Sequence, residues 1–347
     1  MGIRVAVLFG GRSGEHDVSV ASAASIVTHL DRATYDITRV LIGRDGRWWI
    51  DDNEVGLAEA LQCLSDQQVV FPAFHGPYGE DGTVQSLLEL LGVRYVGNGV
   101  LAGAVGMDKE FTKRLLQGAG LRVADGVVLH PSTDLSLVQQ RLRLPVFVKP
   151  ARAGSSLGVS RVDDWLELPD AVRIARKSDQ KVLVESEVRG REIDVAVLQH
   201  PDGRVEAGPP LEITVTSGTF FDYNAKYAHG ASFQIPARLD PDTTNRLQER
   251  ALQAFRALDC RGLLRVDFFV PVPEAGSAPG QGDAAAWSGD PMEPVINEVN
   301  TFPGFTAQSQ YPQIWQQAGI SFGDLLDILI TGALTRDNPL AGVLGSA

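Results

Sequence analysis

Three oxygen-bearing side chains near the C-terminus are the residues best placed to do chemistry. Glu298 and Asn300 lie two positions apart in the segment NEVNTFPGFT, so on an extended strand both side chains point to the same face. Asp267 lies upstream in a second acidic segment, LRVDFF, close to Arg265. Carboxylate and amide oxygens suit Mg²⁺ better than zinc or copper. Two such strands beside an arginine predict a platform for a Mg²⁺-nucleotide, and therefore phosphoryl chemistry.

Two further segments carry groups that could bind such a nucleotide. Lys149 ends the apolar run PVFVKP, and the small residues of RAGSSLG follow it. Small residues let backbone amides approach phosphate oxygens, while the lysine supplies a point charge. Glu185 ends the run VLVES, where a strand edge beside an apolar wall could receive an adenine. A strand that simply runs into a solvated acidic turn is the alternative for Glu185.

Two loops of the N-terminal third could contact a substrate. The turn GGRSGEHDVS follows an apolar strand and opens a helix, so it presents free N–H groups, yet it matches neither GxGxxG nor GxxxxGK[ST]. Glu15 in this turn could bind a substrate ammonium or could simply be an acid favoured by the helix dipole. His75, in FHGPYGEDGT, follows another strand, at the edge where open α/β sheets bind ligands.

The segment TSGTFFDYNAKYAHG, residues 216–230, has no clean helix or strand period. It combines several aromatic residues with Lys226 and Tyr227. Such a loop is typical of an active-site lid, with an ordinary surface loop as the alternative.

A chain of 347 residues is too long for one small core and predicts two or three packed α/β units. Apolar runs at 3–9, 37–42 and 69–74 alternate with helical segments at 18–30 and after 81, which predicts a parallel sheet covered by helices. We expect domains at 1–106, 107–189 and 190–347, with a helix at 322–334. The Gly-, Ala- and Pro-rich stretch 271–294 is expected to be an exposed insertion between the two acidic strands.

Composition excludes several classes of protein. The net charge of −12 argues against binding to nucleic-acid backbones. No run approaches the roughly 20 apolar residues of a membrane span, and the N-terminus enters a strand without a signal-peptide layout. Cys63 and Cys260 lie far apart without metal-ligand spacing, which is typical of reduced, buried thiols. We therefore expect a cytoplasmic protein with neither nucleic acid nor membrane as a partner.

Taken together, the motifs resemble those of the D-alanine–D-alanine ligase family, within the ATP-grasp superfamily. Those that carry the resemblance occur in order along nearly the whole chain: GGRSGEHDVS, HGPYGEDGT, MDK, VKPARAGSSLGVS, FFDYNAKY, RVDFF and NEVNTFPGFT. The resemblance implies an α/β fold with an α+β C-terminal half, in which a Rossmann-like N-terminal domain precedes a two-part ATP-grasp fold. It also implies ATP-dependent, ADP-forming ligation of two D-alanines through an acyl phosphate for peptidoglycan synthesis, two Mg²⁺ or Mn²⁺ ions, and a homodimer.

The resemblance also implies a role for each site residue. The residues expected to bind ATP are Lys109, Lys149, Glu185, Val188, Glu192 and Lys226. The expected metal ligands are Asp267, Glu298 and Asn300. The expected catalytic residues are Glu15, Ser155 and Tyr227 around the first D-alanine, with Arg265 and the Gly304 amide facing the oxyanion. His75 and Ser309 are expected to bind substrate.

Some positions depart from the family pattern, and other functions stay open. Ser186 stands where many relatives carry a lysine near adenine, Phe221 replaces a common tyrosine, and Gln310 replaces an apolar residue. A ligase that makes D-alanyl-D-lactate or D-alanyl-D-serine, or one that serves an antibiotic pathway, is the nearest alternative. The resemblance argues against the lactate version, because relatives of that kind typically carry a histidine-bearing lid segment in place of a pair such as Lys226-Tyr227. A non-catalytic nucleotide-binding module would need a broken catalytic set, and a dehydrogenase would need GxGxxG after the first strand.

Overall fold

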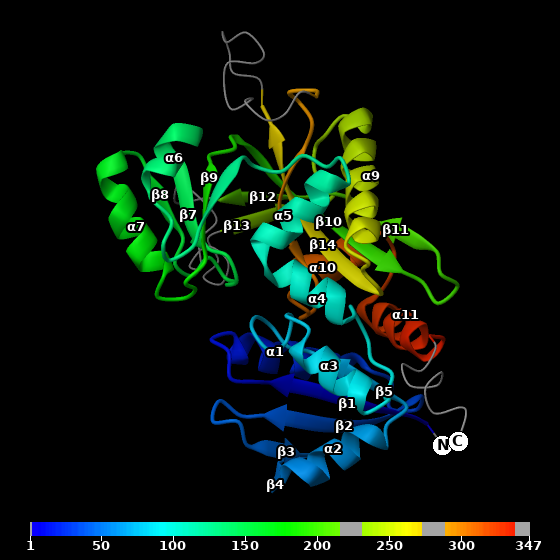
Figure 1. The fold of residues 1–347 in the computed structure, drawn as a ribbon. Helices are drawn as coiled ribbons and strands as arrows, with labels where there is room; N and C mark the ends of the chain where they lie inside the picture. Colours follow the sequence, from blue (N-terminus) through cyan, green and yellow to red (C-terminus); the bar gives the residue numbers. More distant parts are fainter. Residues whose placement is uncertain (1, 216–230, 273–288, 337–347) are drawn as a thin grey trace, which may run out of the picture.

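The computed structural model describes residues 2–215, 231–272 and 289–336. This part of the chain contains a five-stranded, a four-stranded and a six-stranded sheet. In Figure 1 the N-terminal sheet lies at the bottom, the four-stranded sheet at the upper left and the six-stranded sheet at the upper right. The helices α4 (Val100–Met107) and α5 (Lys109–Gly118) join the lower part to the upper parts.

The N-terminal sheet has the order β4-β3-β2-β1-β5. Its strands are β1 (Ile3–Gly10), β2 (Tyr35–Ile42), β3 (Trp48–Ile50), β4 (Asn53–Val55) and β5 (Val69–Pro72). The expected parallel pairing is confirmed, because β1 runs parallel to both β2 and β5. The antiparallel hairpin β3–β4 was not predicted.

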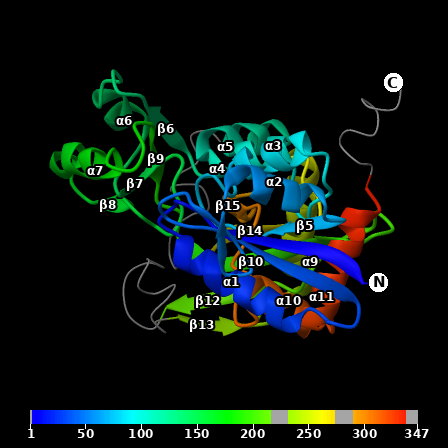
Figure 2. The same ribbon diagram turned by 90° about the horizontal axis from the view of Figure 1, so that it is seen from below.

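Alternating side chains of β1 pack against helices on the two faces of this sheet. The helices are α1 (His16–His29), α2 (Leu57–Ser65) and α3 (Thr83–Leu90). Val5 and Val7 pack with α1 and α11 (Phe322–Leu334), while Ala6 and Leu8 pack with α2 and α3. Figure 2 shows α1 and α11 on one side of the sheet and α2 and α3 on the other.

The four-stranded sheet is antiparallel and has the order β6-β9-β7-β8. Its elements are β6 (Gly126–Leu129), α6 (Ser136–Arg141), β7 (Val146–Pro150), β8 (Ser160–Val162), η1 (Trp165–Glu167), α7 (Leu168–Ala175) and β9 (Val182–Ser186). Val146 and Val148 of β7 face a core shared with α6 and α7. The intervening residues Phe147 and Lys149 line a cavity on the other face. The two-residue period of the strand therefore delivers Lys149 to that cavity.

The six-stranded sheet carries the two acidic strands. Its elements are β10 (Gly190–Gln199), β11 (Val205–Ala207), β12 (Leu211–Val215), β13 (Ala231–Gln234), α9 (Pro241–Ala257), β14 (Leu263–Pro271), β15 (Val295–Asn300), α10 (Gln310–Gln317) and α11. Strand β14 pairs antiparallel with β10 and with β15. At the end of the predicted insertion, residues 289–292 are exposed, while Glu293 and Pro294 are buried and Glu293 pairs with Arg250 at 2.5 Å. Residues 273–288 of that insertion lie outside the described residues.

Within the described ranges, no helix taken alone is long and apolar enough to cross a membrane. Helices α10 and α11 meet that criterion only as a pair bent by 103°.

Candidate active site

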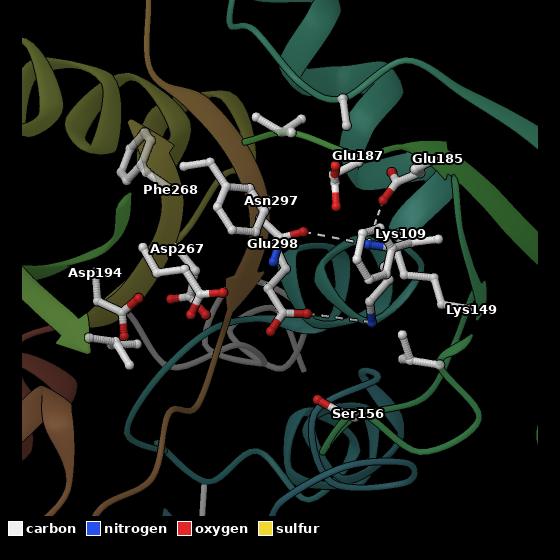
Figure 3. Close-up of a pocket in the computed structure, with 18 of the residues that line it drawn as sticks. Lys109, Lys149, Ser156, Glu185, Glu187, Asp194, Asp267, Phe268, Asn297 and Glu298 are labelled. Carbon is white, nitrogen blue, oxygen red and sulfur yellow. Dashed lines mark hydrogen bonds and ion pairs between the residues drawn. The ribbon is translucent and has the colours of Figure 1, made fainter. Parts of the chain in front are cut away.

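Two adjoining cavities collect the predicted site residues. The first, of about 420 Å³, lies between the four-stranded and six-stranded sheets (Figure 3). The second, of about 640 Å³, lies between the loops of the N-terminal unit and the segment after β15. Residues that line both cavities are Lys109, Ala153, Gly154, Ser155, Arg265, Glu298 and Gln310. All predicted site residues that the structure describes line one cavity or both, while Lys226 and Tyr227 lie outside the described residues.

The two predicted phosphate lysines reach the first cavity from different elements. Lys109, at the start of α5, donates from Nζ to the Ala153 carbonyl at 2.8 Å and lies 3.8 Å from Glu298 Oε2. Lys149 Nζ lies 2.5 Å from Glu185 Oε2 and 3.5 Å from Asn297 Oδ1. Figure 3 shows both lysines directed toward the Asn297–Glu298 part of β15. The arrangement places two positive charges beside the acidic strands.

The other predicted nucleotide residues that the structure describes, Glu185, Val188 and Glu192, line the same cavity. Val188 and Glu192 lie beside apolar side chains of β7, β12 and β14, namely Phe147, Ile213 and Phe268. Glu185 is buried in the cavity wall. Burial pushes the pKa of Glu185 upward, but the ammonium groups of Lys113 and Lys149 outweigh it and hold the pKa below its usual range. An apolar slot that ends in a charged wall is the kind of site that binds a purine nucleotide.

The acidic strands meet as the sequence predicted. Asp267 of β14 lies directly opposite Glu298 of β15, next to a register shift between Asp267 and Phe268. Arg265 binds both oxygens of Asp267, through Nε at 2.7 Å and Nη2 at 2.8 Å. The Asn300 amide donates to Asp267 Oδ2 at 3.0 Å. These contacts fix the Asp267 carboxylate in the wall of the first cavity, beside Arg265, which lines both cavities.

Arg265 is held by further groups that the sequence did not indicate. Its Nη1 donates to Gln310 Oε1 at 3.1 Å, and its Nε lies 3.3 Å from Asp194 Oδ2. Burial alone would lower the pKa of Arg265, but the carboxylates of Asp267 and Asp194 raise it above its ordinary value. Arg265 therefore stays charged in the wall that the two cavities share.

The oxygen donors of the acidic strands suit a metal ion that is shared with a nucleotide. Among the described residues, no group of three or more His, Cys, Asp or Glu side chains is arranged to hold one. Asp267 and Glu298 nevertheless provide two facing carboxylates. Mg²⁺ is commonly held by one or two carboxylates together with the phosphates of a nucleotide, rather than by a cage of protein ligands. The residues present therefore fit a nucleotide-bound Mg²⁺.

Glu15 links the N-terminal unit to the loop after β7. It stands at the N-cap of α1, and its Oε1 accepts a hydrogen bond from Ser155 Oγ. Ser155 has a φ of 52°, in the left-handed region that non-glycine residues rarely adopt. Gly76, with a φ of 74°, packs so closely that a methyl group there would overlap Glu15 Oε2. The carboxylate is thus confined to one position in the second cavity.

His75, which is buried, and Glu80, whose side chain is 14% exposed, lie close together in the wall of the second cavity. The His75 Nε2 lies 2.8 Å from Ser22 Oγ, and its Nδ1 lies 4.0 Å from Glu80 Oε1. Burial lowers the pKa of His75 to about 4. Burial, followed by the charge of Glu15, raises the pKa of Glu80 to about 8. Near neutral pH both groups are therefore uncharged, and they do not form an ion pair.

Sequence reasoning singled out His75 but not Glu80. The signal was present, since Glu80 lies in the same loop motif, FHGPYGEDGT. Its Oε1 accepts the Gly76 N–H at 2.7 Å, and its Oε2 accepts the Phe302 N–H at 3.4 Å. Glu80 therefore connects the loop after β5 to the segment after β15.

The turn after β15 supplies the last predicted residues. Ser309 is the N-cap of α10, and its Oγ accepts the Thr306 N–H at 3.1 Å. A Cβ at Gly304 would lie 3.1 Å from Ser309 Oγ, so the two residues are close neighbours. Both line the second cavity, at a helix N-terminus that favours a carboxylate or an oxyanion.

Comparison with known proteins decides the family. A family model described as the D-ala D-ala ligase N-terminus matches residues 4–67 and 53–98, and one described as the D-ala D-ala ligase C-terminus matches 115–278 and 289–331. The chain belongs to the D-alanine–D-alanine ligase family. The D-alanine–D-alanine ligase of Nocardia farcinica is 45% identical, over 97% of this chain and 99% of the relative. The predicted family and the ligase class of enzyme are confirmed.

Solved structures of D-alanine ligases share the fold. The VanG D-Ala:D-Ser ligase from Enterococcus faecalis matches with a TM-score of 0.78 and 33% identity, over 96% of this chain and 100% of that structure. The D-alanine–D-alanine ligase from Coxiella burnetii matches with a TM-score of 0.78 and 32% identity, over 96% and 94%. The predicted ATP-grasp fold is therefore confirmed. The two structures match equally well although their names differ in the second substrate, so the backbone alone does not select that substrate.

Proposed function

We propose that this protein joins two D-alanines into D-alanyl-D-alanine, with conversion of ATP to ADP and phosphate. The observation that carries the proposal is the wall shared by the two cavities. A nucleotide in the first cavity and amino acids in the second would bring the γ-phosphate and a substrate carboxylate together at this wall. Lys109, Arg265 and Glu298 lie there, which suits phosphoryl transfer onto a carboxylate.

In the first step, a carboxylate oxygen of the first D-alanine attacks the γ-phosphorus of ATP. The bond to the β–γ bridging oxygen breaks, ADP leaves, and an acyl phosphate forms. Glu15, supported by Ser155, would hold the substrate ammonium, with His75 nearby. Lys109 and Lys149 would balance the negative charge of the phosphates, so these residues act by position and charge.

In the second step, the amine of the second D-alanine attacks the acyl carbon, loses a proton and expels phosphate. Arg265 and the Gly304 N–H would stabilise the tetrahedral oxyanion, and Ser309 would bind the carboxylate of the incoming amino acid. Loss of one oxyanion donor typically costs about 3 kcal/mol of transition-state stabilisation. Lys226 and Tyr227 are proposed to act from a lid that keeps water away from the acyl phosphate.

Glu185, Val188 and Glu192 are proposed to bind adenine and ribose. Asp267, Glu298 and Asn300 are proposed to hold two Mg²⁺ or Mn²⁺ ions together with the nucleotide. When bound, these ions neutralise charge on the phosphates. We further infer a homodimer that serves peptidoglycan precursor synthesis, and ATP as the cosubstrate supports a cytoplasmic location.

The proposal is tested with an assay that couples ADP release to a detectable reaction. D-Alanine is supplied with ATP and Mg²⁺ either by itself or together with D-serine, D-lactate or L-alanine as a competing acceptor. We expect ADP formation when D-alanine is the only amino acid, and D-alanyl-D-alanine as the main product in mass spectra of every mixture. A better rate with D-serine or D-lactate at neutral pH would contradict the assignment of the second substrate. Nucleotide binding without ADP formation would favour a non-catalytic module.

A further inference from the structure

A buried carboxylate in the nucleotide cavity is held by two lysines at once. Glu185 Oε2 lies 2.5 Å from Lys149 Nζ, and Glu185 Oε1 lies 2.6 Å from Lys113 Nζ. The side chains of Lys113 and Glu185 are 9% and 4% exposed. Among the described residues, Lys113 Nζ and Glu185 Oε1 have no other polar partner. Each oxygen of the carboxylate therefore has its own ammonium group.

The two lysines that contact Glu185 line different cavities. Lys149 and Glu185 line the nucleotide cavity, whereas Lys113 does not. Lys113 and Glu185 line a different cavity, of about 420 Å³, together with residues of α5 and β6 such as Arg114 and Val127. Glu185 thus lines both cavities. Lys113 does not line the nucleotide cavity, and its ion pair is with Glu185, which does.

The charges of Lys113, Lys149 and Glu185 together determine how strongly Lys149 can attract the phosphates of a nucleotide. Two ammonium groups and one carboxylate leave a net charge of +1. Without Lys113, Glu185 and Lys149 would neutralise each other as a buried pair, in surroundings where such attraction is strong. Lys149 would then be a weaker partner for a phosphate. Burial lowers the pKa of Lys113, and Glu185 partly offsets this.

We propose that Lys113 is a positioning residue for the nucleotide: it neutralises Glu185 and so leaves the charge of Lys149 available to the phosphates. The inference rests on the proposed function, in which Lys149 binds phosphate. A purely structural Lys113–Glu185 pair would stabilise the fold without any selective effect on phosphate binding. Loss of a positioning Lys113 would therefore weaken the binding of a nucleotide with phosphates more than that of adenosine, whereas loss of a purely structural Lys113 would not.

The first experiment measures the dissociation constants of AMP-PNP with Mg²⁺ and of adenosine by calorimetry. For Lys113→Met we expect weaker AMP-PNP binding by about tenfold or more, on the scale of a hydrogen bond to a charged group. Adenosine binding and the KM for D-alanine should stay within about twofold. Lys113→Arg should restore most of the affinity. Arg114→Met is the matched control, because Arg114 lines the same cavity, is exposed, and pairs with Glu110 rather than Glu185.

The second experiment repeats Lys113→Met in a Glu185→Gln background. A neutral glutamine needs no cation, so the double variant should bind AMP-PNP as Glu185→Gln does. This comparison also decides the matter if Lys113→Met alone fails to fold. Equal loss in both backgrounds, or equal weakening of AMP-PNP and adenosine, would overturn the inference. A wild-type protein that neither binds AMP-PNP nor consumes ATP with D-alanine would instead contradict the proposed function.

Discussion

At the scale of single residues, burial decides which acids of the site are charged. The side chains of Glu80 and Glu185 are only 14% and 4% exposed, yet the structure shifts their pKa values in opposite directions. Glu185 has two ammonium partners, whereas Glu80 has the carboxylate of Glu15 nearby. The protein thus keeps one acid ionised beside the lysines and another protonated beside the uncharged His75.

The raised pKa of Glu80 predicts a pH dependence of stability. The carboxyl ionises near pH 4.5 in the unfolded chain and near pH 8 in the folded one, so between these values the folded state binds more protons. The contribution of Glu80 is therefore fully present below pH 4.5 and is lost as pH rises through 8. Glu80→Gln resembles the protonated acid and should remove this slope. We expect the variant to gain on the order of 3 kcal/mol relative to wild type between pH 5 and pH 8.

Urea unfolding at pH 5, 6.5 and 8 measures the effect. His75 acts in the opposite direction, because the unfolded chain takes up its proton as pH falls from 6.5 toward 4. That contribution is common to both proteins and cancels in the difference. Parallel pH profiles for wild type and Glu80→Gln would show that Glu80 is ionised in the folded protein.

Glu298→Ala tests the proposed metal site. Glu298 faces Asp267 across the strands and lies 3.8 Å from Lys109. Removal of its carboxylate should lower kcat for ligation by about a hundredfold or more, on the scale of other lost electrostatic contacts to a reacting centre. The melting temperature should change little, since the side chain lines a cavity. Glu54→Ala, an exposed acid paired with Arg47, is the control, and unchanged turnover in Glu298→Ala would refute the metal assignment.

At the scale of elements, the spacing of apolar residues along the sequence predicted helices and strands whose formation depends on neighbouring residues. The helix expected at 322–334 is α11, because buried residues such as Leu325, Leu329 and Ala333 recur at helical spacing. The hairpin β3–β4 was missed for a physical reason. Its strands have three residues each, and its turn places Asp51 and Asp52 at positive φ, where a glycine would have been the usual signal.

Residue spacing along the sequence could not predict contacts between elements that lie far apart in the chain. The position of Lys113 on α5 says nothing of Glu185 on β9, and the motif around Glu80 does not reveal that a second acid, Glu15, lies close by. The oxygen-bearing face of β15 was predictable because Glu298 and Asn300 lie two residues apart on one strand. The arginine partners Asp194 and Gln310 come from other elements, so only the assembled fold identifies them.

Loop geometry predicts a contrast between two glycines near Glu15. Gly76 has a positive φ, and an added Cβ would overlap the Glu15 carboxylate, whereas a Cβ at Gly14 meets nothing within 4 Å. Gly76→Ala should therefore displace Glu15 and raise the KM for the first D-alanine by about tenfold or more, as expected when a charged contact is lost. Gly14→Ala should leave it unchanged. Steady-state kinetics over a range of D-alanine concentrations gives both values, and equal KM values would contradict the assigned role of Glu15.

At the scale of the whole molecule, the units share cores as well as cavities. One hydrophobic cluster contains Val5 and Phe71 of the N-terminal sheet together with Trp315 of α10 and Leu326 of α11. We propose the division 1–106, 107–189 and 190–347 for the three units, and the separate sheets support it. The shared cluster suggests that the first and third units unfold together.

Asn98 joins the same two units through hydrogen bonds, and a substitution at this position tests whether the units unfold together. Its buried side chain donates to the carbonyls of Leu263 at 2.7 Å and Thr301 at 2.8 Å, and accepts the Arg261 N–H at 2.8 Å. Leu263 begins β14 and Thr301 follows β15, so Asn98 ties the N-terminal unit to both acidic strands. Asn98→Ala leaves three backbone groups without these partners, which should lower the free energy of unfolding by about 3 kcal/mol.

Urea denaturation followed by both fluorescence and circular dichroism measures this loss. Asn53→Ala is the control, because Asn53 is exposed and its amide makes only long contacts to Ile50 and Asp51, so its effect should stay within about 0.5 kcal/mol. If Asn98 couples the units, the two probes should coincide in wild type and separate in Asn98→Ala, since the strands and the N-terminal unit would then unfold at different urea concentrations. A stability equal to that of Asn53→Ala would show that the hydrophobic cluster alone joins them.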